Sequence, residues 1–160
     1  MIGQAFHVQA VHEDVSGPTL LCTGLVRSIN VVAVRVAHQV GIPKVIAQAR
    51  KMGIESHLPR VPSISLGAGE TTLMEMVRSY STFPKGGTCI APRLVLSVYD
   101  RDLQLILHNP VRTKQAMSPQ TAYVMTYMLK QCVERGTGRR ARNLSWVWLI
   151  FDDHKCLNFS

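Results

Sequence analysis

Residues 19–40 have the sequence TLLCTGLVRSINVVAVRVAHQV, in which two apolar segments meet at Ser28-Ile29-Asn30. The first segment mixes apolar and small residues and predicts a helix over residues 19–27, which Gly24 weakens by about 1 kcal/mol of helix propensity. Asparagine often stands just before a helix, so Asn30 is expected to cap a second helix over residues 31–40. That segment is apolar on nearly every side, which predicts a helix buried inside a domain.

The valines of residues 31–40 leave a second interpretation open. β-Branched residues suit a buried strand on propensity alone, and a short apolar run does not separate a helix from a strand by its periodicity. The choice between a helix and a strand for residues 31–40 therefore depends on the sequence that follows.

Four further landmarks follow along the chain in a fixed order. They are Leu66-Gly67-Ala68-Gly69-Glu70-Thr71-Thr72, Arg78-Ser79-Tyr80-Ser81-Thr82-Phe83 closing on Gly86-Gly87, Pro119-x-Thr121-Ala122-Tyr123, and Arg135-Gly136-Thr137-Gly138-Arg139-Arg140-Ala141-Arg142. Together with Ser28-x-Asn30, they resemble the transpeptidase domain of class A penicillin-binding proteins. The resemblance covers residues 16–142 and leaves residues 1–15 and the tail 143–160 unassigned.

The resemblance implies an α+β fold. We expect the mostly helical portion of the β-lactamase/transpeptidase-like fold, with a small β-hairpin and an incomplete sheet. Residues 31–40 are then a helix rather than a strand. The tail, which holds both tryptophans, is interpreted either as a short strand or as the product of a reading-frame change or truncated gene.

Two of the three motifs that serve this chemistry are missing from the 160 residues. Enzymes of this group combine Ser-x-x-Lys, Ser-x-Asn and Lys-Thr-Gly. No serine here has a lysine three positions later, and Lys-Thr-Gly does not occur. We therefore predict an inactive fragment that starts and stops inside a larger serine-type D-Ala-D-Ala transpeptidase domain.

The resemblance assigns catalytic roles to Ser28 and Asn30. Ser28 would relay a proton between the family's lysine and the leaving nitrogen, while Asn30 would orient that lysine and bind the substrate peptide. The partners implied for the complete domain are the peptidoglycan stem peptide and β-lactams. The structural alternative is that Ser28 ends one helix and Asn30 caps the next.

The positive charge of the chain suggests a second class of function, the binding of an anionic partner. The net charge is +8 and the isoelectric point is near 9.7, which permits attraction to anions without selecting one. A dense basic cluster of Arg135, Arg139, Arg140 and Arg142 supports an alternative, a small basic binding module for nucleic acid or an anionic cell-wall polymer. The transpeptidase interpretation involves no nucleic acid. A third possibility is a degraded gene product without activity.

No cofactor or metal is expected. Cys22, Cys89, Cys132 and Cys156 form no Cys-x-x-Cys pair, and the scattered histidines lack ligand spacing. Neither a signal peptide nor an apolar run of about 20 residues is visible. Family members are normally anchored in the inner membrane and exposed to the periplasm, so membrane contact is expected only through segments absent here.

The remaining pattern predicts three helices and a hairpin. One helix begins at Pro43 and stops at Gly53, and a second begins with the capping box formed by Thr72 and Glu75. Apolar and more polar residues alternate over residues 94–98 and 103–107, which predicts a β-hairpin. A long helix is capped by Ser118 and stops at Gly136.

Overall fold

The computed structural model describes residues 7–8 and 19–143 of the chain. Its helices are α1 (Leu21–Val26), α2 (Asn30–Val40), α3 (Ile42–Lys51), α4 (Leu73–Ser81) and α5 (Pro119–Arg135), with 3-10 turns η1 (Pro62–Leu66) and η2 (Arg139–Asn143). Its strands are β1 (His7–Val8), β2 (Thr19–Leu20), β3 (Thr88–Ile90), β4 (Ser97–Tyr99), β5 (Leu105–His108) and β6 (Thr113–Gln115). This confirms the α+β class.

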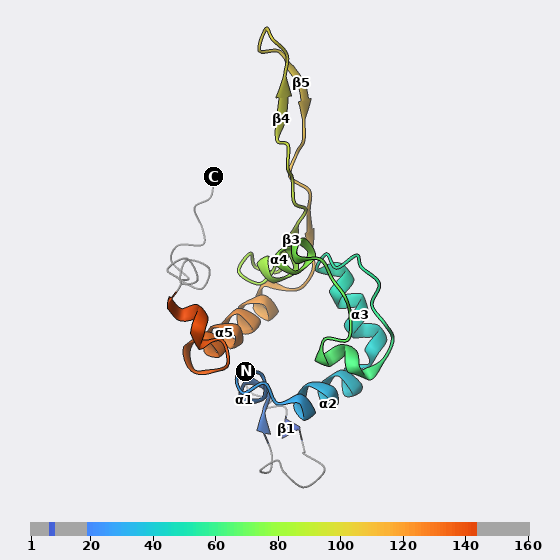
Figure 1. Cartoon of the computed structure of the whole chain (residues 1–160), viewed down its shortest axis with the longest axis vertical. Helices are drawn as coiled ribbons and strands as arrows, with labels where there is room; N and C mark the ends of the chain where they lie inside the picture. Colours follow the sequence, from blue (N-terminus) through green and yellow to red (C-terminus); the bar gives the residue numbers. More distant parts are fainter. Residues whose placement is uncertain (1–6, 9–18, 144–160) are drawn as a thin grey trace.

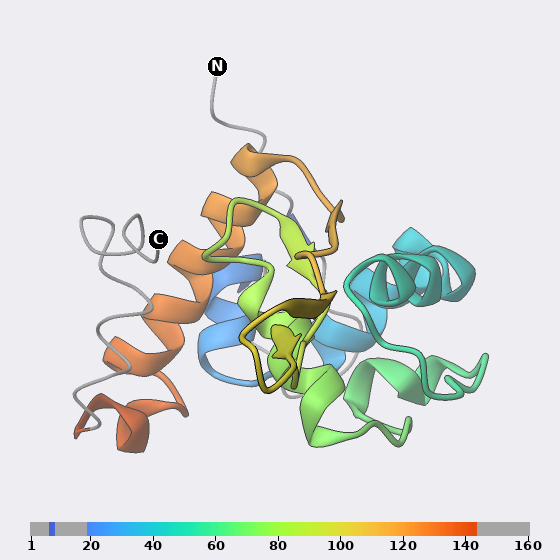
Figure 2. The same cartoon turned by 90° about the horizontal axis from the view of Figure 1, so that it is seen from above.

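The strands form three separate two-stranded antiparallel sheets within the described residues. β3 pairs with β6 and β4 pairs with β5, so residues 88–115 make one long hairpin arm. The arm projects away from the helices (Figure 1). Below it, α4 lies between α5 on one side and α3 on the other (Figure 2). The hairpin predicted from residues 94–98 and 103–107 is confirmed, with Val98 opposite Leu107.

Three helix predictions are confirmed together with their caps. Ser118 precedes α5, and its hydroxyl oxygen accepts the Thr121 N–H at 3.2 Å. Gly53 follows α3 with φ of 94°, a left-handed conformation that favours glycine. Thr72 and Glu75 form the predicted capping box at the start of α4.

The helix at residues 19–27 is shorter than predicted, and α2 is less buried. Thr19 and Leu20 pair with β1, so α1 begins only at Leu21. Within α2 only Val32 and Ala37 are buried, while Val31 is 41% exposed. The prediction of a helix buried inside a domain is therefore wrong for the described residues, in which most of α2 is half-buried or exposed.

The buried apolar side chains are few and mostly small. They are Val26, Val32, Ala37, Ile54, Cys89, Ala116 and Ala122. Large apolar side chains lie at the surface instead: on α4, Leu73 is 80% exposed, and Val77 and Tyr80 are exposed beside it. These three residues are four and three positions apart, so they share one face of α4. Its exposure is the pattern of a helix whose packing partner lies outside the described residues.

One polar cluster ties the start of α4 to the loop after α3. The Glu75 carboxylate accepts the backbone N–H groups of Glu55 and Ser56, both at 2.7 Å. It also accepts the Ser56 hydroxyl at 2.5 Å and the Thr72 N–H at 2.9 Å. These donors, led by the Ser56 hydroxyl, lower the pKa of Glu75 to about 2, because they favour the charged carboxylate.

Glu75 is predicted to make folding sensitive to acid. A carboxyl group whose pKa is lowered by folding adds stability above its unfolded pKa, and this is lost as the pH falls. The loss should therefore occur between about pH 4.5 and pH 2, the two values for Glu75. Urea unfolding followed by circular dichroism at pH 5 and at pH 2.5 should show a smaller acid-induced loss for Glu75→Gln than for the wild type.

The exposed Glu70, in the loop before α4, supplies the matched control. Glu70→Gln should keep the wild-type loss of stability between the two pH values. Equal losses in Glu75→Gln and in the wild type would contradict the assignment.

Candidate functional site

Ser28 lies in a tight turn directly after α1. The helix ends at Val26 with Arg27 as its C-cap. The Ser28 N–H then donates to Leu25 O at 3.1 Å, and the Ile29 N–H donates to Gly24 O at 2.8 Å. These two hydrogen bonds define a Schellman motif, whose left-handed position is usually glycine. Here it is Ser28, with φ of 55°.

The left-handed serine is an informative outlier. For a residue with a Cβ atom this conformation costs roughly 1–2 kcal/mol. Backbone strain of this kind is concentrated at functional sites, where the position of a side chain matters more than local stability. The turn directs the chain into α2 so that Ser28 and Asn30 are both exposed while Ile29 between them is half-buried.

Asn30 does not cap α2. The N-cap residue is Ile29, which makes no side-chain hydrogen bond to the helix, and Asn30 is the first helical residue. The predicted capping role is therefore wrong, because the turn after α1 enters the helix one residue early. The Asn30 side chain therefore does not serve as the N-cap of α2.

Two glycines bring the surrounding helices close to this turn. A Cβ atom at Gly24 would lie 2.6 Å from Val32 Cγ1, so glycine is needed where α1 meets α2. A Cβ atom at Gly136 would lie 2.5 Å from the Val26 carbonyl oxygen. That carbonyl accepts the Thr137 N–H at 3.3 Å, which joins the end of α1 to the end of α5. The Ser28 turn is thus fixed by helices on both sides.

The turn offers polar groups but the described residues offer no activated nucleophile beside it. A serine hydroxyl both donates and accepts, and an asparagine amide does the same without net charge. Cys132 is half-buried, and burial raises the pKa of its thiol, which disfavours the reactive thiolate. Within the described residues, no group of three His, Cys, Asp or Glu side chains is placed to hold a metal ion.

The family profile described as penicillin-binding protein transpeptidase domain matches residues 3–147. The chain therefore belongs to the penicillin-binding protein transpeptidase family. The predicted relationship to class A members is confirmed by the relatives below. The division of the chain at residues 15 and 142 stays a prediction, and the tail beyond Asn143 lies outside the described residues.

Two relatives define the similarity in sequence. Penicillin-binding protein 1A of Clostridium acetobutylicum is 36% identical over 132 residues, which are 79% of this chain and 16% of that protein. Penicillin-binding protein 1B of Escherichia coli K12 is 31% identical over 126 residues, or 78% of this chain and 15% of that protein. The chain thus corresponds to about one sixth of each relative.

Solved structures show the same fold. Penicillin-binding protein 1A from Haemophilus influenzae has a TM-score of 0.71 at 20% identity, covering 79% of this chain and 25% of that one. Penicillin-binding protein 3 from Mycobacterium tuberculosis, complexed with aztreonam, has a TM-score of 0.71 at 19% identity over 86% of this chain and 40% of that one. The expected portion of a transpeptidase-like fold is confirmed. In the described part of the chain, no helix has the length and apolar character needed to span a bilayer.

The left-handed turn generates a prediction about stability. Glycine adopts this conformation without the Cβ clash but loses more chain entropy on folding. Ser28→Gly should therefore raise the free energy of unfolding by about 0.5 kcal/mol, whereas Ser28→Val should lower it by about 1 kcal/mol or more. Urea unfolding monitored by circular dichroism measures both changes.

Ser63→Gly is the control, because Ser63 is exposed and has no left-handed backbone. There glycine should cost about 0.5–1 kcal/mol. If Ser28→Gly destabilised the chain as much as Ser63→Gly, the strain assigned to Ser28 would be refuted.

Proposed function

We propose that residues 19–40 supply the Ser-x-Asn part of a penicillin-binding D,D-transpeptidase site, and that the 160 residues alone do not acylate. The observation that carries this proposal is the Ser28 turn. It holds a serine in a strained conformation between two closely packed helices, with Asn30 exposed two residues later. A purely structural turn has no need of serine at a position where glycine is preferred.

Proton transfer is the chemistry that suits these side chains. Acylation of a serine by an amide or β-lactam needs a base for the nucleophile and a proton for the leaving nitrogen. The Ser28 hydroxyl accepts one proton as it donates another, so it moves a proton without becoming charged. Asn30 supplies an amide donor and acceptor that orient a neighbouring ammonium group or a peptide.

We infer the substrate and the location by analogy with the family, and both concern the whole protein. Related structures of penicillin-binding protein A from Mycobacterium tuberculosis are described as imipenem and penicillin G acyl-enzyme complexes. By analogy, the complete site would take peptidoglycan stem peptides and β-lactams. The whole protein would act in the periplasm from an inner-membrane anchor.

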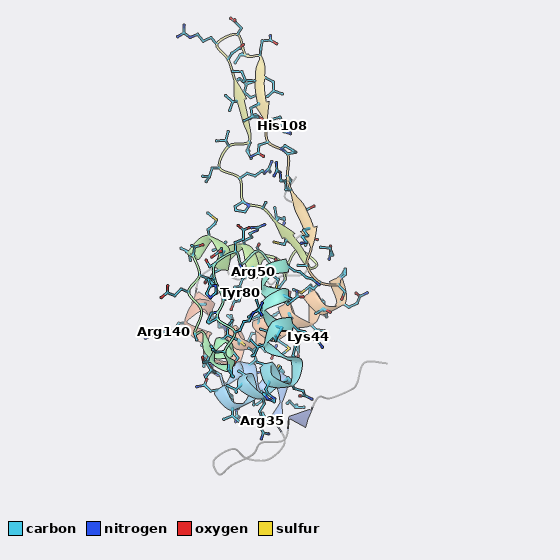
Figure 3. All side chains as sticks on the ribbon, turned by 90° about the vertical axis from the view of Figure 1, so that its right-hand side faces the viewer. Arg35, Lys44, Arg50, Tyr80, His108 and Arg140 are labelled. Carbon is cyan, nitrogen blue, oxygen red and sulfur yellow. The ribbon has the colours of Figure 1, made fainter. Side chains whose placement is uncertain are left out.

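The alternative of a basic binding module receives less support. Arg35 and Lys44 lie apart from Arg140, a member of the basic cluster (Figure 3), so part of the positive charge lies outside that cluster. A polyanion is bound through many contacts that neutralise successive charges on one surface. Dispersed cations favour solubility over such a surface.

A chimera tests the proposed roles of Ser28 and Asn30. Residues 19–40 would replace the aligned segment of penicillin-binding protein 1A from Haemophilus influenzae, a protein whose fold matches. The chimera should be acylated by a fluorescent penicillin. In it, Ser28→Ala should lower the second-order acylation rate constant by about 100-fold or more, and Asn30→Ala by about tenfold.

Gln39→Ala, an exposed change on α2 in the same graft, is the control and should leave the rate constant within about twofold. Rates in Ser28→Ala equal to those of the unsubstituted chimera would refute the proton-relay role. A folded chimera that is not acylated would refute the equivalence of the segments.

A further inference from the structure

A small cavity adjoins the Ser28 turn on the side facing α5. It measures about 190 Å³ and is lined by Thr23, Val26, Arg27 and Arg135. Arg27 is the C-cap of α1 and directly precedes Ser28, while Arg135 is the last residue of α5. Both arginines are exposed at the surface, and one from each helix end lines the same cavity beside the candidate site.

The shared cavity depends on the close contact at Gly136. The absence of a side chain there lets the Val26 carbonyl approach the end of α5, and the Thr137 N–H donates to it at 3.3 Å. This contact fixes the ends of both helices. The two arginines are brought to one place by the packing of the backbone, although 108 positions separate them in the sequence.

Neither arginine is neutralised by an acidic side chain of the described residues. The ion pair found there joins Arg78 to Glu55 at 2.8 Å, in another part of the molecule. Glu134, next to Arg135 in sequence, instead accepts a hydrogen bond from the Gln131 amide at 2.9 Å. Two cationic side chains without acidic partners beside one cavity attract an anion, although solvent screens the charges at an exposed site.

We propose that this cavity binds a single oxyanionic group, a carboxylate or a phosphate. Guanidinium groups present parallel N–H donors that match the oxygen atoms of both anions. Thr23 lines the same cavity and adds a hydroxyl. A water molecule occupies about 30 Å³ of liquid, so about 190 Å³ accommodates one such group but not a folded stretch of polymer. The ligand would place its charge one residue away from Ser28.

A purely structural role for these arginines makes a different prediction. A cation in the last turn of a helix stabilises the helix dipole, and Arg135 holds that position in α5. Such a role would change the stability of the chain and would give no saturable binding of anions. The test must therefore measure binding and stability separately.

The test uses the whole 160-residue chain and two probes, inorganic phosphate and succinate, which separate the two anion chemistries. Nitrogen–proton NMR spectra of the arginine side chains would follow each titration, with sodium chloride at matched ionic strength as the reference. The Nε–H signals of Arg27 and Arg135 should shift saturably with at least one probe. Arg27→Gln and Arg135→Gln should each weaken binding about tenfold or more.

Arg101→Gln, an exposed change in the turn of the hairpin arm, removes the same charge and should alter the affinity less than about twofold, because distant surface charges are screened. Circular dichroism establishes that each variant is folded, and Thr23→Val provides a further variant at the cavity should one arginine substitution unfold the chain. Equal shifts in sodium chloride, or unchanged affinity in the folded cavity variants, would overturn the proposal.

Discussion

The Schellman turn at Ser28 connects α1 to α2 and lies where α1, α2 and α5 meet. Its two backbone hydrogen bonds end α1 and start α2 within three residues. The absence of a side chain at Gly24 lets Val32 pack against α1, and the absence of one at Gly136 lets α5 pack against Val26. Because these contacts converge on one turn, the direction of Ser28 and Asn30 is set by packing rather than by their own interactions.

The same close packing of helices explains why many large apolar side chains are exposed to solvent. Close contacts at glycine and alanine bring helix backbones together but bury few large side chains. The exposed Leu73 and Val77 of α4 and the apolar side chains of the hairpin arm would be costly in an isolated domain. The chain spans about one sixth of the length of its relatives, and we interpret these faces as surfaces that need a partner beyond the described residues.

Local chemistry predicted the elements well, but it did not predict tertiary environment. The capping box at Thr72, the stop at Gly53 and the Ser118 cap depend on neighbouring backbone groups, so the sequence was sufficient. The burial of α2 depends on contacts between distant segments, which its apolar composition does not reveal, and so it was overestimated. Ser28-x-Asn30 was found by its motif. Its left-handed backbone and the cavity shared by Arg27 and Arg135 gave no local signal, since both arise from helix packing.

The central claim is that these 160 residues hold a proton-relay element without the serine nucleophile that it serves. Intact-protein mass spectrometry after incubation with excess penicillin G tests it most directly, with an active penicillin-binding protein 1A treated in parallel. We expect an unchanged mass for this chain and a penicilloyl adduct on the active protein. A stoichiometric adduct on this chain, mapped to any of its serines, would contradict it.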